Sequence, residues 1–155
     1  MCEAGGSPRT AGRAADTGNI GYLGDRGGRG SLLAIEASIT LARGPASPKR
    51  ARDFVAEAVD CSVDLDVLDV IILLTSEVVT NAVLHARTEA RLKVVVGRAA
   101  VRVEVIDGER REPVPRRAAV DDTSGRGLQL VDALSSRWGV EALRAGKRVW
   151  FEVDR

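Results

Sequence analysis

Apolar residues recur along the chain with two different periods, and each period predicts one type of element. Alternation of apolar with small or polar residues is typical of strands, whose side chains point to the two faces of a sheet in turn. It occurs in residues 33–41, 92–96, 101–105, 138–140 and 149–153. A spacing of three and four residues is typical of helices that bury one face. It occurs in residues 48–60, 64–86 and 128–134.

Turn and capping residues set the limits of these helices. Ser47 is placed to cap the first helix, and Pro48 suits a first helical turn, where the backbone N–H that proline lacks would be unpaired anyway. Either Asp64 or Asp66 can cap the second helix, which is the longest. A polar stretch from Asp107 to Ser124 separates the periodic residues 101–105 from the periodic residues 128–134.

Short connections between successive strands indicate the fold class. Residues 97–100 and the turn at 145–147 are short enough to join neighbouring strands as hairpins. Hairpins produce antiparallel pairs, and helices that are apolar on one side must cover one face of the sheet. The sequence thus predicts an α+β fold, a two-layer α/β sandwich with a mixed, mostly antiparallel sheet and helices on one face.

The first 30 residues differ in composition from the rest. Gly, Arg, Ala and Asp dominate them, and Ile20, Tyr22 and Leu23 are their sizeable apolar side chains. So few apolar groups cannot offset the entropy of ordering the chain. We therefore expect a disordered N-terminal tail over residues 1–30 and one domain over residues 31–155. The glycines of residues 24–31 lack the Gly-Lys-Ser/Thr ending of a phosphate-binding loop.

Charge and cysteine content narrow the functional classes. The 23 basic and 22 acidic residues leave a formal net charge of +1, so no overall field favours direct binding to nucleic acid or to a membrane surface. The two cysteines are too few for a disulfide framework, and the first residues lead into no apolar segment. These features favour a cytoplasmic protein in which Cys2 and Cys61 are plain thiols.

Two short motifs carry residues that suit a site. Glu77, Asn81 and His85 follow one another at four-residue intervals, so they share one stripe of the long helix. A solvated helix edge would explain that stripe equally well, and for His85 we expect local packing rather than metal binding. Asp107 and Gly108 end a valine-rich strand, where they either start a turn or face a ligand.

A third motif, Gly125-Arg126-Gly127-Leu128, opens the third predicted helix. Glycines at a helix start let backbone N–H groups approach an anion, and the positive end of the helix dipole favours phosphate. A Gly-x-Gly pattern is by itself a weak signal. The three motifs therefore gain specificity only from their order and from the elements on which they lie.

In that order, the motifs resemble those of the GHKL ATPases. The segment Glu-Val-Val-Thr-Asn-Ala-Val-Leu-His-Ala, residues 77–86, is similar to the N box of this family. Asp107-Gly108 is similar to its first glycine box and Gly125-Arg126-Gly127-Leu128 to its second. The resemblance extends to residues 137–140 and 146–151 and covers roughly residues 31–155. It is strongest to the anti-sigma-factor serine/threonine kinases of high-GC bacteria, because the chain shows no dimerisation helices or phosphoacceptor segment before the motifs.

The resemblance implies a Bergerat-type fold, the cofactors ATP and Mg²⁺, and a role for each motif. Asn81 would bind Mg²⁺ through its side-chain oxygen, and Glu77 would be the general base that deprotonates a serine of a partner protein. Asp107 would accept the adenine amino proton, and residues 109–124 would form a lid over ATP. The implied nucleotide-binding set is Asn81, Asp107, Gly108, Gly125, Arg126, Gly127 and Leu128.

The resemblance also implies partners and exposes two departures. The chain would bind a sigma factor and phosphorylate a STAS-type antagonist of the anti-sigma factor, without direct contact to nucleic acid or membrane, and a homodimer is an open alternative. Glu109 stands where the family pattern prefers another glycine, and Arg148 stands where many relatives carry a threonine that contacts adenine. Both departures would weaken nucleotide binding, so a non-catalytic ATP-binding module that switches partners is the alternative to a kinase.

Overall fold

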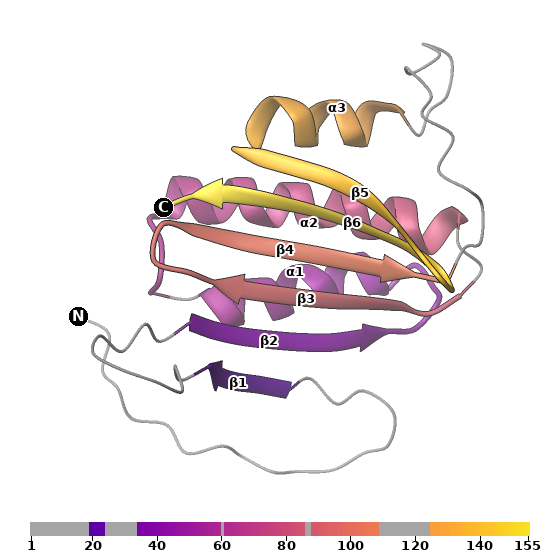
Figure 1. Ribbon diagram of the computed structural model, residues 1–155, viewed down its shortest axis with the longest axis horizontal. Helices are drawn as coiled ribbons and strands as arrows, with labels where there is room; N and C mark the ends of the chain where they lie inside the picture. Colours follow the sequence, from indigo (N-terminus) through magenta and orange to yellow (C-terminus); the bar gives the residue numbers. More distant parts are fainter. Residues whose placement is uncertain (1–18, 24–33, 60, 86–87, 109–124) are drawn as a thin grey trace.

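A computed structural model describes residues 19–23, 34–59, 61–85, 88–108 and 125–155. In this part of the chain, six strands form one antiparallel sheet, and three helices lie on one side of it, as Figure 1 shows. The strands are β1 (Asn19–Leu23), β2 (Ala34–Leu41), β3 (Ala90–Val96), β4 (Ala100–Asp107), β5 (Arg137–Leu143) and β6 (Gly146–Asp154). The helices are α1 (Ser47–Val59), α2 (Leu65–His85) and α3 (Gly125–Leu134). The predicted α+β sandwich of two layers is confirmed.

The sheet has the strand order β1-β2-β3-β4-β6-β5. β3 and β4 form the first predicted hairpin, in which the N–H of Gly97 donates to the carbonyl of Ala100 over 2.9 Å. β5 and β6 form the second, in which Leu143 pairs with Gly146. Because β4 pairs with β6, the last strand of the chain lies inside the sheet and β5 lies at its edge. None of the described helices is long and apolar enough to cross a membrane.

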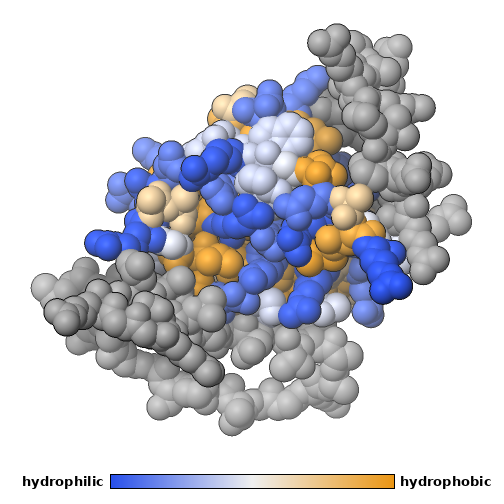
Figure 2. All heavy atoms as spheres, in the orientation of Figure 1, coloured by the Kyte–Doolittle hydropathy of each residue, from blue (hydrophilic) through white to orange (hydrophobic). Residues whose placement is uncertain are grey.

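The two faces of the sheet differ in composition. Val103 and Val105 of β4 are buried against the helices, and Phe151 of β6 pairs with Val103 on the same face. The opposite side, called here the open face, carries the intervening residues. On β4 and β6 these are Arg102, Glu104, Ile106, Arg148, Trp150 and Glu152. Figure 2 looks onto this side and shows mainly hydrophilic side chains, with apolar ones between them, on its described part.

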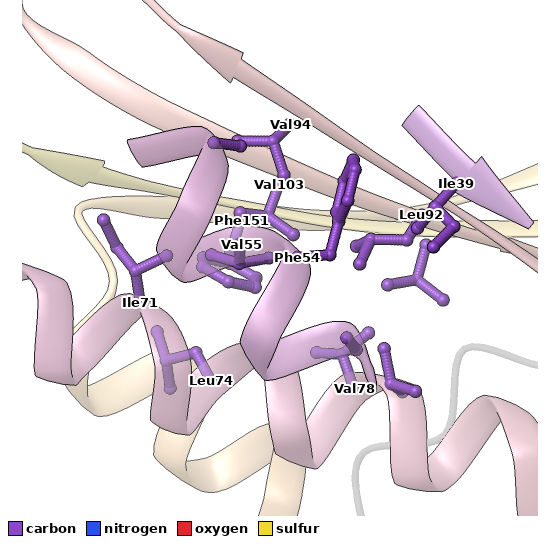
Figure 3. Packing of buried hydrophobic residues seen from close by; sticks show 14 of the residues in the cluster. Ile39, Phe54, Val55, Ile71, Leu74, Val78, Leu92, Val94, Val103 and Phe151 are labelled. Atoms are coloured by element: carbon purple, nitrogen blue, oxygen red, sulfur yellow. The ribbon is translucent and has the colours of Figure 1, made fainter. Parts of the chain in front are cut away.

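The core fills the space between the sheet and the helices α1 and α2. Figure 3 shows side chains of both helices converging on those of the central strands. Ile71, Leu74 and Phe151 are completely buried, and burial of each such side chain contributes about 1.5–3 kcal/mol. This packing determines the rotation of α2 about its axis. With Ile71 and Leu74 turned toward the sheet, Glu77 and Asn81 remain half-buried beside the core.

The hydrogen bonds at the starts of α1 and α2 show which of the predicted residues cap these helices. The carbonyl oxygen of Asp64 accepts the first helical hydrogen bond of α2 from the N–H of Leu68 at 3.0 Å, so Asp64 is the cap residue. α1 begins at Ser47 with Pro48 in its first turn, as expected. The Ser47 hydroxyl, however, donates to the carbonyl of Ala42. It therefore ties the helix to the preceding connection instead of capping it.

The expected disordered tail is wrong for the five residues of β1. This strand pairs with β2 in antiparallel register, from Asn19 opposite Ser38 to Leu23 opposite Ala34. The edge of β2 offers a row of backbone donors and acceptors, so a short strand gains order by pairing there without a core of its own. The other residues of 1–30 lie outside the described residues, and the division into tail and domain stays a prediction.

Cys61 is a second correction. The sequence favours a plain thiol, but Cys61 is disulfide-bonded. A chain with two cysteines contains no spacing pattern from which pairing could be predicted. Cys61 also has a φ of 58° in the turn that follows α1, the left-handed conformation that often ends a helix.

The core contains one polar group that yields a stability prediction. Thr75 of α2 is completely buried, and its hydroxyl has no hydrogen-bond partner among the described residues. Burial of an unpaired hydroxyl costs desolvation energy, and no hydrogen bond compensates for it. We expect Thr75→Val to raise the free energy of unfolding by about 1 kcal/mol, measured by urea denaturation. Thr75→Ala is the control and should lower it, because it leaves a cavity. A loss of stability in Thr75→Val would mean that the hydroxyl is paired in solution.

Candidate functional site

Several segments meet at one end of the sheet. α2 ends at His85, and β3 begins shortly afterwards at Ala90, which pairs with Asp107 at the end of β4. Asp107 also pairs with Lys147, next to the turn between β5 and β6. α3 begins at Gly125 and packs against α2, and Figure 1 shows its start at this same end. The three sequence motifs are thus brought to one end of the fold.

Glu77 and Asn81 lie directly against Gly127 in the first turn of α3. A Cβ placed on Gly127 would stand 2.8 Å from Nδ2 of Asn81 and 3.1 Å from Oε2 of Glu77. Such separations are shorter than ordinary contacts of a carbon atom, so a residue with a side chain fits here only if the two α2 side chains move. Gly127 is buried, whereas Glu77 and Asn81 are half-buried. The solvated-edge interpretation of these two residues therefore does not hold.

Asp107 is a buried carboxylate held by its neighbours. It is 2% exposed, and Nζ of Lys147 lies 3.7 Å from its Oδ2. Gly146, with a φ of 138°, lies so close that a Cβ on it would overlap with the carbonyl oxygen of Asp107. Only glycine combines that φ with that approach. A charge this deeply buried requires an ionic or hydrogen-bonding partner, and Lys147 supplies one.

Thr88 is a residue of this region that the sequence did not single out. Its Oγ1 accepts a hydrogen bond from the N–H of Gly108 at 3.0 Å. A Cβ on Gly108 would stand 3.1 Å from the same side chain. Thr88 therefore fixes the backbone just after Asp107. It lies in the connection between α2 and β3, where neither helical nor strand periodicity marks a residue, so its role depends on tertiary contact alone.

Arg148 does not occupy the position expected from the resemblance. It lies on the open face, where its guanidinium contacts Oε2 of Glu141 at 3.0 Å and Oε2 of Glu104 at 3.5 Å. Asp107 points to the helix side, so the sheet separates the two residues. The residue of β6 that shares the side of Asp107 is Lys147. The expectation that Arg148 removes a contact to adenine is therefore wrong.

Arg148 belongs instead to a network of ion pairs on the open face. Arg102 contacts Oε1 of Glu104 at 2.7 Å and Oε1 of Glu152 at 3.0 Å, and its guanidinium carbon lies 3.9 Å from the centre of a Trp150 ring. Partial burial lowers the pKa of Arg102, but hydrogen bonds and charges of the two glutamates outweigh it and raise the pKa. Glu104 is 9% exposed beneath these arginines. Arg102 and Arg148 are thus both engaged by glutamates of this face.

A hollow of about 400 Å³ lies on another side of α2. Its lining comes from the connection after β2 and from α2, and consists of Arg43, Gly44, Pro45, Pro48, Thr80 and Val83. Thr80 and Asn81 are consecutive on a helix, so their side chains project about 100° apart. None of the predicted site residues that the structure describes lines this hollow. It is therefore separate from the site at Glu77 and Asn81.

Some predicted site residues lie outside the described part of the structure. They comprise the predicted lid, residues 109–124 with Glu109, and the side chains of His85 and Arg126. Gly125 begins α3, and Leu128 follows the buried Gly127 as a half-buried residue in its first turn. The described site therefore consists of Glu77, Asn81, Asp107, Gly108 and the start of α3.

The residues present fit a nucleotide with its metal ion. Asn81 offers an amide oxygen, the kind of hard ligand that Mg²⁺ accepts. The start of α3 offers backbone N–H groups beside it, at a position where Gly127 keeps the space free of a side chain. Asp107 offers a buried acceptor at the same end of the sheet. A metal ligand, a phosphate-binding helix start and a base acceptor are the parts that such a ligand needs.

Comparison with known proteins agrees with this chemistry. The model of the family described as histidine kinase-like ATPase domain matches residues 41–153. The match covers more than half of the chain and includes all the predicted site residues, so the chain belongs to this family. It is thus a domain of the histidine kinase-like ATPase class. No curated protein matches the chain, and β1 with most of β2 lies before the matched segment.

The contact of Gly127 with α2 gives a prediction on binding. Alanine is favoured over glycine in a helix by about 1 kcal/mol, so Gly127→Ala should not weaken α3 by itself. Its Cβ would displace Asn81 and Glu77. We expect the variant to fold but to bind Mg-ATP at least tenfold more weakly, a change of about 1.4 kcal/mol, measured by isothermal titration calorimetry.

The matched control is Gln129→Ala, which removes an exposed side chain from the same helix. It should bind Mg-ATP as the unchanged protein does. Equal affinity of Gly127→Ala and the unchanged protein would exclude the start of α3 from the nucleotide site.

Proposed function

We propose that this ATP-binding domain is an anti-sigma-factor-type regulator that phosphorylates a serine of a partner protein in the presence of Mg²⁺. The supporting observation is the contact of Glu77 and Asn81 with Gly127. It combines a carboxylate, an oxygen ligand for a metal ion and a helix N-terminus within a few ångströms of one another. A carboxylate beside a phosphate-binding element is what transfer of a phosphoryl group to a hydroxyl requires.

Each residue has one role in this proposal. ATP, when bound, supplies the γ-phosphoryl group. Asn81 holds the metal ion through its side-chain oxygen, and the N–H groups at the start of α3 hold phosphate oxygens. Glu77 would accept the proton of the serine hydroxyl. The serine oxygen would then bond to the γ-phosphorus, while the bond between that phosphorus and the oxygen of ADP breaks. Asp107 accepts a hydrogen bond from the base, which orients the nucleotide.

The proposed partners follow from the family resemblance of the sequence. A sigma factor would be the protein that the domain sequesters, and a STAS-type antagonist would carry the phosphorylated serine. Both proteins act in the cytoplasm, and neither role involves direct contact of this chain with nucleic acid or membrane.

A non-catalytic ATP-binding module that switches partners is the second candidate. One observation favours it: the carboxylate of Asp107 is in ion-pair contact with Lys147. A base must share or displace that contact, which reduces the free energy gained on binding. The two candidates differ in whether the γ-phosphoryl group leaves ATP, and they share the nucleotide site.

Glu77 and Asn81 should fail in different ways. Glu77→Gln keeps the shape of the side chain but cannot accept a proton, so Mg-ATP should still bind while phosphoryl transfer falls by about 10²–10⁴-fold. Asn81→Ala removes the oxygen ligand and should weaken Mg-dependent nucleotide binding at least about tenfold. Calorimetry measures binding, and transfer of labelled phosphate to the STAS-type protein encoded nearest in the genome measures turnover.

Glu57→Gln is the control for the change of charge, because Glu57 is an exposed carboxylate on α1. It should leave both measurements unchanged. Equal transfer by the unchanged protein and Glu77→Gln would remove Glu77 as the base. ATP binding without transfer to any such antagonist would favour the partner-switching module.

A further inference from the structure

Lys147 and Asp107 form a cross-strand pair at the end of the sheet where the base of a nucleotide would lie. Their α-carbons are partners in the β4–β6 register, and Nζ and Oδ2 lie 3.7 Å apart. We propose that this pair contacts two neighbouring positions on the edge of a purine, and that the site consequently accepts GTP as well as ATP. The inference rests on the proposed nucleotide-binding function and specifies its substrate class.

The two members of the pair differ in freedom of movement. The side chain of Asp107 is 1% exposed, and its backbone is confined by Gly146 and by the hydrogen bond between Gly108 and Thr88. Lys147 is 28% exposed and ends a flexible four-carbon stem. Asp107 is therefore a fixed acceptor, whereas the ammonium of Lys147 can adjust its position along the edge of a bound base.

The chemistry of the pair is complementary to either purine. An ionised carboxylate accepts only, and an ammonium group donates only. Adenine presents an amino donor beside a ring nitrogen that accepts. Guanine presents a carbonyl acceptor beside a ring N–H donor on its Watson–Crick edge. One acceptor and one donor side by side can therefore satisfy each base, with the base in a shifted position.

Without Lys147, the same site would discriminate strongly. A carboxylate facing the amino group of adenine makes a good hydrogen bond, but facing the carbonyl of guanine it would leave two acceptors opposed and unpaired. A site whose buried polar groups remain unpaired rejects the wrong ligand by a large factor. The donor of Lys147 removes that penalty, so base selection by Asp107 alone applies only when position 147 carries no donor.

The ion-pair geometry places a donor and an acceptor side by side, at a spacing that one edge of a base can face. A separation of 3.7 Å is an ion pair but exceeds the usual length of a direct N–H···O hydrogen bond. An ammonium group has three donors, so it can contact a base while it stays beside Asp107. The competing explanation is that Lys147 only neutralises the buried carboxylate, and the experiment separates the two.

The test is calorimetric binding of Mg-ATP, Mg-GTP and Mg-ITP to the unchanged protein and to Lys147→Met, which keeps the stem of the side chain but removes the charge. We expect the unchanged protein to bind GTP within about tenfold of ATP. Lys147→Met should lose GTP affinity about ten- to hundredfold more than ATP affinity, the usual effect of removing a charged donor. ITP has the carbonyl and ring N–H of guanine without its amino group, so it should follow GTP.

Two further variants control the result. Lys147→Arg retains a donor and should keep GTP binding. Arg148→Met removes the neighbouring cation of β6, which lies on the open face, and should leave the ratio of ATP to GTP affinity unchanged. Circular dichroism verifies that each variant is folded.

Each contrary outcome has a separate meaning. If the unchanged protein binds ATP but not GTP or ITP, the inference is wrong and the nucleotide function stands. If Lys147→Met loses ATP and GTP affinity equally, Lys147 is a structural partner of Asp107 and the inference is wrong. If no nucleotide binds to the unchanged protein, the proposed function itself fails.

Discussion

The rotation of α2 about its own axis determines the arrangement of the site. Ile71 and Leu74 are completely buried against the sheet, and this apolar packing is worth several kcal/mol. Because a helix is rigid, its polar stripe then has one possible direction, beside the core and toward the start of α3. Glu77 and Asn81 meet Gly127 for that reason. The polar chemistry of the site is thus a consequence of apolar packing one turn away.

Two positions of the site depend on the lack of a side chain. At Gly127 the space beside α2 is taken by Asn81 and Glu77, and at Gly146 it is taken by the carbonyl of Asp107. These glycines differ in their requirements. Gly146 needs both its positive φ and its close approach, whereas Gly127 lies in a regular helix and needs only the approach. Together they hold α3 against α2, and β6 against β4.

Much of the fold and part of the site could be predicted from local patterns. The strand and helix periods gave the order of elements, and the three motifs gave residues that do converge. Local patterns failed where order depends on a distant partner, as for β1, which is stabilised by the edge of β2, and for Thr88, which is placed by Gly108. Arg148 was assigned to the site through the family resemblance, which does not tell which face of the strand this position occupies. That information lies in the register of β6 on β4.

The register of β6 has a consequence for how its two adjacent cations should be compared between relatives. Lys147 and Arg148 are neighbours in the chain and both are half-buried, yet the sheet separates them. Lys147 lies beside Asp107 on the helix side, whereas Arg148 lies beside Glu104 and Glu141 on the open face. Because side chains alternate, a shift of one residue would exchange the two environments and also turn Phe151 outward. The hydrophobic core therefore determines which of the two cations lies beside Asp107. An alignment of relatives that keeps Phe151 inside places position 147, and not 148, on the side of Asp107.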